Sequence, residues 1–348
     1  MAIRRIDAKR IVLDTPEALF SAFNNPYILR REMHRLYQWL NERGLTSLTT
    51  GERTSVHESR FGLEEYIADC VILLDYRIHD QISTRRLRIF KYRGSAHGTN
   101  EYPFLITSHG LAVLPITSVR LDHSAPNERL GSGIGALDEM RGGSGLYRGS
   151  SVLVSGTAGT GKSSLAASFA AAACERGEAA LYIAFEESPA QIVRNMQGIG
   201  LDLTHWQAAG LLHVHAQRPA TTGLEAHLVQ IRQWQRDIDP RVIVIDPISS
   251  LLPLGTTSQV RAMLARLIDY FKQAQVTTLF TYLGHAEEGF SETQVGVSSL
   301  MDVWISLAQA LHRARRQRSL TIIKARGIDC ADEARLVTFG STGICLAA

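Results

Sequence analysis

The stretch that most restricts the fold of this chain is a glycine-rich loop between an apolar strand and a helix. The apolar residues 151–154 run into GTAGTGKSS at 156–164, and an alanine-rich segment follows at once. The pattern GxxxxGK[ST] is complete and lies in the strand–loop–helix setting that a phosphate-binding loop requires. The sequence therefore predicts an α/β protein that binds a nucleoside triphosphate, rather than a glycine turn without function.

The residue types of this loop suggest their roles. Glycines permit backbone angles that turn N–H groups toward phosphates, and the start of the following helix adds partial positive charge. Lys162 can reach the outer phosphates, and the Ser163 hydroxyl can ligate Mg²⁺. We therefore expect ATP and Mg²⁺ to bind at the loop residues Gly156, Thr157, Ala158, Gly159, Thr160, Gly161, Lys162, Ser163 and Ser164.

A second apolar strand ends in an aspartate. Residues 242–245 are consecutive β-branched residues, which suits a strand buried on both faces, and Asp246 follows them. Open α/β sheets bind ligands at the carboxyl ends of their strands, so we expect Asp246 to hold Mg²⁺ through water. A strand-end aspartate can also be a turn or cap residue, and the phosphate loop is what favours the metal role.

A third apolar strand ends in two adjacent carboxylates. Residues 180–185 are followed directly by Glu186 and Glu187. One carboxylate can polarise a nucleophile, either water or a hydroxyl, beside the γ-phosphate, and the other can orient that nucleophile or the metal. We predict Glu186 and Glu187 as catalytic residues, with Glu186 also near Mg²⁺. The alternative is that both acids only complement the dipole of the helix that begins at SPAQ.

An internal repeat accounts for the long segment that precedes the loop. Strand-end aspartates recur with a step of 232 residues, and three other pairs recur with a step of 233: Asp14 with Asp246, then Asp69 with Asp302, Lys91 with Lys324, and Arg93 with Arg326. A near-constant step across unlike motifs indicates a tandem duplication. We predict the back half of a first module without a phosphate loop, a linker and a complete second module, at residues 1–118, 119–133 and 134–348.

Composition argues against several classes of partner. The 348 residues include 37 Lys and Arg against 34 Asp and Glu, a formal charge of +3, which predicts no strong attraction to polyanions. We interpret the most basic run, residues 312–319, as a solvated turn. No stretch reaches the roughly 18 apolar residues of a membrane helix, and the four cysteines show no metal or disulfide spacing. We expect a cytoplasmic protein without a membrane or nucleic-acid partner.

These motifs, together with several longer strings, resemble the KaiC family of RecA-type ATPases. The matching strings are GIGALDEM, VSGTAGTGKSSLA, FEESPAQIVRNM, GLEAHL, VIDPISSLL, VSSLMD, KARG and KYRGSAHGTNEYPF. The resemblance implies a RecA-like P-loop fold in tandem, with the first copy incomplete, and a homohexamer that binds ATP between subunits. It also implies ATPase and Ser/Thr autokinase activity in a bacterial circadian or signalling system, with KaiA-like, KaiB-like or histidine-kinase partners.

The same resemblance assigns residues outside the loop. Lys324, Ala325 and Arg326 match the segment that reaches a neighbour's ATP, although such cations are commonly just solvated. Ser298 and Ser299 match the adjacent pair that the family phosphorylates on itself, whereas without the family they are small polar residues at a strand entry. Less specific matches are Ile199 at the adenine position, Glu225 and Arg261 at the subunit interface, and Lys91, Arg93, Ser95 and His97 for a trans contact of the first copy.

Three functions are compatible with these observations. The first is an ATPase and Ser/Thr autokinase, the second a RecA-type DNA-handling ATPase, and the third a nucleotide-binding scaffold without kinase activity. DNA handling requires loops rich in basic and aromatic residues, whereas residues 284–297 contain neither Lys nor Arg. The missing loop of the first copy favours the scaffold, and the complete second site opposes it. We expect the first function.

Overall fold

A computed structural model describes residues 6–15, 26–52, 67–79, 82–107, 110–113, 125–143, 145–284, 296–313, 315–340 and 343–347. The predicted linker is therefore described only from residue 125, and most of the stretch 284–297 lies outside the described residues. The chain divides into two units, residues 1–75 with 86–102 and residues 76–85 with 103–348. The larger unit contains the phosphate loop.

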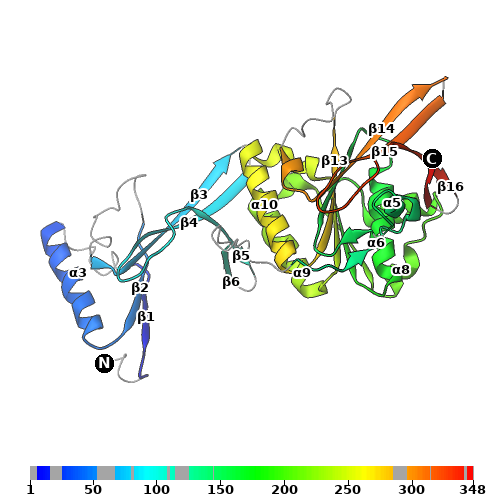
Figure 1. The fold of residues 1–348 in the computed structure, drawn as a ribbon. Helices are drawn as coiled ribbons and strands as arrows, with labels where there is room; N and C mark the ends of the chain where they lie inside the picture. Colours follow the sequence, from blue (N-terminus) through cyan, green and yellow to red (C-terminus); the bar gives the residue numbers. More distant parts are fainter. Residues whose placement is uncertain are drawn as a thin grey trace. The chain divides into compact units, whose positions relative to one another are not determined.

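The larger unit is built on a sheet that has nine strands among the described residues (Figure 1). Neighbouring strands are parallel from β11 through β10, β12, β13 and β9 to β14, and β15, β16 and β17 then join antiparallel. This confirms the predicted RecA-like, mostly parallel sheet. In chain order the strands are β9 (Ser151–Gly156), β10 (Ala180–Ala184), β11 (Leu212–Ala216), β12 (Val242–Asp246), β13 (Thr277–Leu283), β14 (Val303–His312), β15 (Arg315–Ala325), β16 (Arg335–Gly340) and β17 (Gly343–Ala347).

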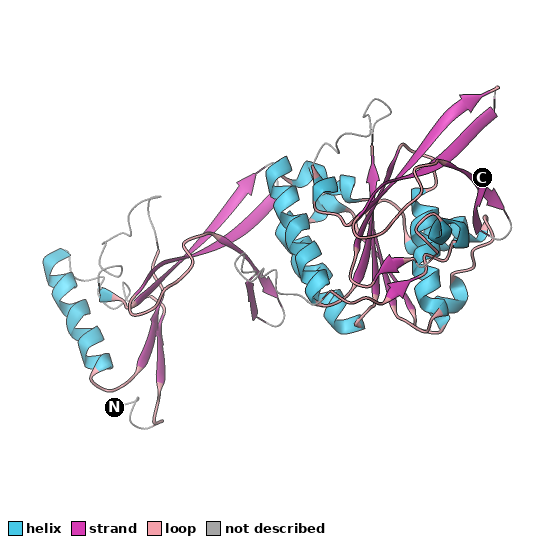
Figure 2. Ribbon diagram, viewed as in Figure 1, coloured by secondary structure: helices cyan, strands magenta, loops and turns pink. Residues whose placement is uncertain are grey.

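Helices cover both faces of this sheet (Figure 2). One core joins α5, α6, α7 and α8 to Val242 and Val244, and a second core joins α9 and α10 to Ile243 and Ile245. Successive side chains of a strand point to opposite faces, so the β-branched run of β12 serves both cores. The helices are α5 (Gly135–Glu139), α6 (Lys162–Glu175), α7 (Pro189–Gln197), α8 (Thr204–Ala208), α9 (Leu224–Ile238) and α10 (Thr257–Gln273).

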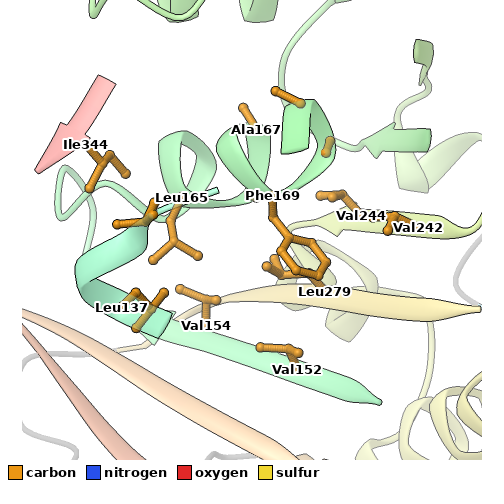
Figure 3. Packing of buried hydrophobic residues seen from close by; sticks show 14 of the residues in the cluster. Leu137, Val152, Val154, Leu165, Ala167, Phe169, Val242, Val244, Leu279 and Ile344 are labelled. Carbon is orange, nitrogen blue, oxygen red and sulfur yellow. The ribbon is translucent and has the colours of Figure 1, made fainter. Parts of the chain in front are cut away.

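Helix α6 is buried along most of its length. Its many alanines bring the helix backbone close to the sheet, and Figure 3 shows Leu165 and Phe169 among the side chains of Val154 and Leu279. A helix that is apolar all round is a core helix. Because α6 begins at Lys162, directly after the loop, this packing holds the helix N-terminus at the carboxyl end of β9.

Short elements complete the larger unit. A two-stranded pair, β7 (Arg129–Leu130) with β8 (Leu146–Tyr147), precedes β9. The 3₁₀ turns within the part of the chain that the structure describes are η2 (Pro219–Thr221), η3 (Ile248–Leu254) and η4 (Val297–Ser299). Among the described residues, no helix has both the length and the apolar character needed to cross a membrane.

The described residues of the N-terminal segment form two small sheets. In the first, β1 (Arg10–Leu13) pairs parallel with β2 (Thr46–Thr49), and α3 (Pro26–Asn41) connects them in the chain. The second contains β3 (Cys70–His79), β4 (Ile82–Tyr92), β5 (Tyr102–Thr107) and β6 (Gly110–Val113) in that order.

Strand register and hydrogen bonding repeat between the two parts of the chain. Strand β1 pairs with β2 from Arg10 opposite Thr46, and β12 pairs with β13 from Val242 opposite Thr277. The Arg93 amide donates to the Asp69 carbonyl at 2.8 Å, and the Arg326 amide donates to the Asp302 carbonyl at 2.9 Å. The repeat seen in the sequence is therefore a repeat of structure.

The two copies differ in the strand that joins the two halves of the sheet, which is β9 in the larger unit. In the larger unit, β9 lies between β13 and β14 and pairs with both. In the N-terminal copy, the counterparts of β13 and β14 are β2 and β3, which belong to separate sheets in the described residues. The side chains of Ile72, Leu74, Tyr76 and Ile78 on β3 are more than half exposed. The predicted boundaries of the two modules remain predictions.

Candidate nucleotide-binding site

Two glycines let the phosphate loop pass close to its neighbours. A Cβ atom at Gly156 would lie 2.3 Å from the Leu307 carbonyl oxygen, and one at Gly161 would lie 2.5 Å from the Phe339 ring. Gly161 also has a φ of 103°, in the left-handed region, and it caps α6. Residue size and backbone conformation therefore both explain why glycine occupies these positions.

Lys162 lies folded over the loop. Its ammonium donates to the carbonyl oxygens of Gly156 and Thr157, both at 2.8 Å. Burial lowers the pKa of Lys162 below its ordinary value, and the charges of Asp246 and Glu186 partly oppose that shift. The cation is therefore poorly solvated and stands near both carboxylates, as expected of a group that binds phosphate oxygens.

Asp246 ends β12 in a cluster of hydroxyl groups. The Tyr182 hydroxyl donates to Asp246 Oδ2 at 2.5 Å, and the Thr281 hydroxyl donates to Asp246 Oδ1. Burial and the charge of Asp246 raise the pKa of Tyr182 well above its ordinary value, and a hydrogen bond with Ser163 acts in the opposite direction. The hydroxyls of Tyr182 and Thr281 therefore orient Asp246, one of the two predicted Mg²⁺ ligands.

The predicted catalytic carboxylates follow β10 at the same end of the sheet. Ser250 donates to Glu186 Oε1 at 2.7 Å, and Asn195 donates to Glu187 Oε2 at 3.0 Å. Helix α7 is capped by Ser188, in a reciprocal capping box with Gln191. Glu186 is the more exposed of the two glutamates and lies close enough to Lys162 to affect its pKa. Ser188 therefore caps α7, and the catalytic and helix-dipole roles of the two glutamates remain predictions.

Three residues beside the loop were missed by the sequence analysis. Arg318 Nε donates to the Gly159 carbonyl at 2.9 Å, and its guanidinium lies 5.0 Å from the centre of the Phe339 ring. Gln309 donates to the Ala158 carbonyl at 3.2 Å. No motif marks these residues, because β14, β15 and β16 bring them to the loop from far along the chain.

The interpretation of residues 312–319 as a solvated turn was right about solvent exposure for residues 312, 313 and 315–317 but wrong about the turn for most of the run. Residue 312 ends β14 and residues 315–319 belong to β15, so most of the run is strand. Arg318, within it, contacts the loop. A charge run indicates contact with solvent along part of a segment and does not determine its secondary structure.

Ile199 and the interface residues lie in ordinary structural surroundings. The Ile199 side chain packs against the core beneath α6, and its carbonyl accepts from the Gly343 amide at 2.9 Å. Glu225 is half-buried in the first turn of α9. Neither observation tests the predicted adenine or interface roles.

A second cluster surrounds Ser298 and Ser299 in η4. Lys324 donates to the Ser298 carbonyl at 3.1 Å, and Arg326 donates to the Ser299 carbonyl at 2.9 Å. Arg261 donates to Ser299 Oγ at 3.2 Å. Burial and the charge of Arg326 lower the pKa of Lys324. The chain therefore brings together residues that the sequence analysis had placed separately, as trans ATP contacts, phosphoacceptors and an interface residue.

The two clusters lie at opposite ends of β9. The Asp302 amide, three residues after Ser299, donates to the carbonyl of Ser151, where β9 begins. Gly156, where the phosphate loop begins, is at the other end of that strand. At a rise of about 3.3 Å per residue, the strand separates these ends by roughly 16 Å. The serine pair is therefore remote from the phosphate loop of its own chain.

The predicted trans residues of the first copy occupy the end of β4 and the turn after it. Arg93 lies 3.4 Å from Asp69 in an exposed ion pair, and the Ser95 hydroxyl donates to the Ala96 carbonyl at 3.3 Å. Lys91 is the penultimate residue of β4, and His97 is half-buried. Lys91 and Arg93 repeat the positions of Lys324, the penultimate residue of β15, and of Arg326, directly after that strand.

A glycine-rich loop with a buried lysine, facing strand-end carboxylates on a mostly parallel sheet, defines a P-loop ATPase of the RecA type. A family model described as ATPase: KaiC matches residues 1–118 and 130–346. The chain belongs to this family of KaiC ATPases, as the resemblance had implied.

Curated relatives agree with this assignment. The "Circadian clock protein KaiC2" of Synechocystis sp. is 47% identical over 99% of this chain and 61% of its own length. The "Circadian clock oscillator protein KaiC" of Picosynechococcus sp. is 34% identical over 94% of this chain and 64% of its own length. The chain thus spans less than two thirds of the length of these relatives.

Proposed function

We propose that this chain hydrolyses ATP and phosphorylates its own serines, with ATP bound between neighbouring copies in a homohexamer. The proposal extends to a bacterial circadian or signalling system, because the similar proteins are named as clock proteins. Partners similar to KaiA or KaiB, or a histidine kinase, belong to the same proposal.

The observation that carries the proposal is the separation of the two clusters. Ser299 is exposed and lies with Lys324 and Arg326 in one patch, at the opposite end of β9 from the loop of the same chain. A second copy that presents its ATP to Lys324 and Arg326 would meet the serines at the same time. Transfer between copies therefore needs no rearrangement within the chain.

The residues present fit the proposed reaction. Ser163 and Asp246 offer the oxygen ligands that Mg²⁺ prefers, at the start of α6 and at the end of β12. When bound, Mg²⁺ would neutralise charge on the phosphates beside Lys162. Glu186 accepts the proton of the attacking serine hydroxyl as its oxygen bonds to the γ-phosphorus, the bond to the β-phosphate oxygen breaks, and ADP leaves. In hydrolysis, a water molecule replaces the serine.

The proposal also assigns a role to the basic residues at the end of β4 in the N-terminal copy. Lys91 and Arg93 stand where Lys324 and Arg326 stand in the second copy, and Ser95 and His97 follow them. Residues 1–118 contain no phosphate loop, so we propose that these residues would contact a nucleotide only where a neighbouring first module has such a loop. The division into modules at residues 1–118 and 134–348 rests on the same repeat.

A mixing experiment tests transfer between copies. One variant, Glu186→Gln, keeps both serines, and the other, Ser298→Ala with Ser299→Ala, keeps the carboxylate. After subunit exchange and addition of ATP labelled with ³²P at the γ position, we expect label on Glu186→Gln only in the mixture. An unlabelled mixture beside a labelled unaltered chain would place transfer within one copy. Absence of label on the unaltered chain would contradict the proposed kinase activity and would favour the nucleotide-binding scaffold.

A further inference from the structure

We propose that Tyr182 is a positioning residue for the Mg²⁺–nucleotide complex, because its phenol group holds the metal ligand Asp246 in place before any ligand binds. The proposal deepens the function proposed above and rests on its Mg²⁺ site.

The strand register directs Tyr182 toward the aspartate. In the parallel pairing of β10 with β12, Ala184 lies opposite Asp246 and Tyr182 lies opposite Val244. Residues two apart on a strand share a face, so Tyr182, Ala184 and Asp246 all point to the side covered by α6. The small side chain of Ala184 leaves room for the long Tyr182 side chain to reach forward to the end of β12.

The contacts of the phenol group are all within the site. Tyr182 is 1% exposed, so its hydroxyl is sequestered from bulk water. It donates to Asp246 Oδ2 at 2.5 Å. A buried hydroxyl on β10 therefore fixes the orientation of the carboxylate at the end of β12.

Thr281 supports the aspartate from the opposite side. It lies on β13, the other neighbour of β12, and its buried hydroxyl donates to Asp246 Oδ1. Each carboxylate oxygen thus has one hydroxyl donor. A carboxylate has about four acceptor positions, so two donors fix its orientation and leave positions for water or metal. Such support raises the affinity for Mg²⁺, because the Asp246 side chain loses less conformational freedom when the metal binds.

The test compares Tyr182→Phe with Tyr270→Phe. Tyr270 is a matched control because its hydroxyl donates to Gln235 at 2.6 Å and belongs to the core on the opposite face of the sheet. Calorimetry gives the ATP affinity with Mg²⁺ and with a chelator, and the ratio of the two is the contribution of the metal. We expect Tyr182→Phe to reduce this ratio about tenfold and to leave the metal-free affinity unchanged, since a hydrogen bond to a charged group is worth about that much.

A second variant separates positioning from a general loss of structure. In an Asp246→Asn background there is no carboxylate to orient, so Tyr182→Phe should cause no further change in the ratio. An unchanged ratio in Tyr182→Phe, beside a normal ratio in the unaltered chain, would overturn the role of Tyr182 alone. No effect of Mg²⁺ on the unaltered chain would overturn the metal site and, with it, this inference. Loss of folding in Tyr182→Phe would also overturn it, because the hydroxyl would then be a structural requirement.

Discussion

Each of the carboxylates Glu186 and Asp246 is oriented by hydroxyl donors of its own. Ser250 donates to Glu186, while Tyr182 and Thr281 donate to Asp246. Such bonds constrain the rotamer of each acid without changing its charge. We infer that catalysis depends on these hydroxyl groups as well as on the acids that they orient.

The Ser250→Ala variant tests this dependence at Glu186. The variant removes the donor at 2.7 Å and leaves the carboxylate free to rotate. We expect the turnover number for ATP hydrolysis to fall by about tenfold, in line with a hydrogen bond to a charged group, with little change in ATP affinity. The measurement is steady-state phosphate release beside calorimetric binding. Equal losses of affinity and turnover would indicate damage to the loop instead.

The residues of the phosphate loop were predictable because neighbouring residues in the sequence carry the whole motif. Asp246, Glu186 and Glu187 were predictable because each follows an apolar run at a strand end. Tyr182, Ser250 and Arg318 were not, because each acts through a partner on another strand or turn. Tertiary pairing of this kind leaves no pattern in a single sequence.

Among the elements, Asp302 joins three that are distant in sequence. It accepts from the Ser151 amide at the start of β9, pairs with Lys272 of α10 at 2.8 Å, and lies 3.6 Å from Arg326 after β15. Burial raises the pKa of Asp302, but the bonds from Lys272 and Ser151 outweigh burial and the net pKa is lowered. Arg326 connects this junction to the serine pair, because it also donates to the Ser299 carbonyl.

The Asp302→Asn variant tests the junction. We expect a loss of about 2 kcal/mol in the free energy of unfolding at neutral pH, because Lys272 loses a buried charged partner. A lowered pKa stabilises the fold above the ordinary value of about 3.9, and this contribution is lost as the pH falls toward the folded value. The difference between variant and unaltered chain in urea titrations should therefore shrink below about pH 4.

The repeat supplies a matched control for this variant. Asp69 occupies the equivalent position, but its ion pair with Arg93 is long and exposed. Exposed pairs contribute little, so Asp69→Asn should leave the urea midpoint almost unchanged. An Asp302→Asn midpoint equal to that of Asp69→Asn would contradict the structural role of the junction.

The strands and helices of the second copy were largely predictable, since β-branched runs and an alanine-rich segment mark them. The β14–β15 hairpin was only partly predictable. Its charged end was interpreted as a turn, because the part of a hairpin that extends beyond a core has no apolar alternation to indicate strands. The contact of Arg318, on β15, with the phosphate loop was visible only in the structure.

Across the whole molecule, the duplication and the family membership were both evident from the sequence. The common register of β1–β2 and β12–β13 then showed that the copies share a fold as well as motifs. The sequence did not predict that β2 and β3 belong to separate sheets. In the second copy β9 lies between the corresponding strands, β13 and β14, and pairs with both. The proposed function also depends on the whole molecule, because Ser298 and Ser299 lie at the opposite end of β9 from the phosphate loop of the same chain.

The central claim is that ATP is held jointly by two copies, and light scattering with a saturating non-hydrolysable ATP analogue tests it most directly. We predict that the unaltered chain assembles when the analogue is added, and that Lys324→Ala with Arg326→Ala binds the analogue through its own loop but assembles poorly. The opposite result, a chain saturated with nucleotide that keeps the mass of a single copy, would contradict the account.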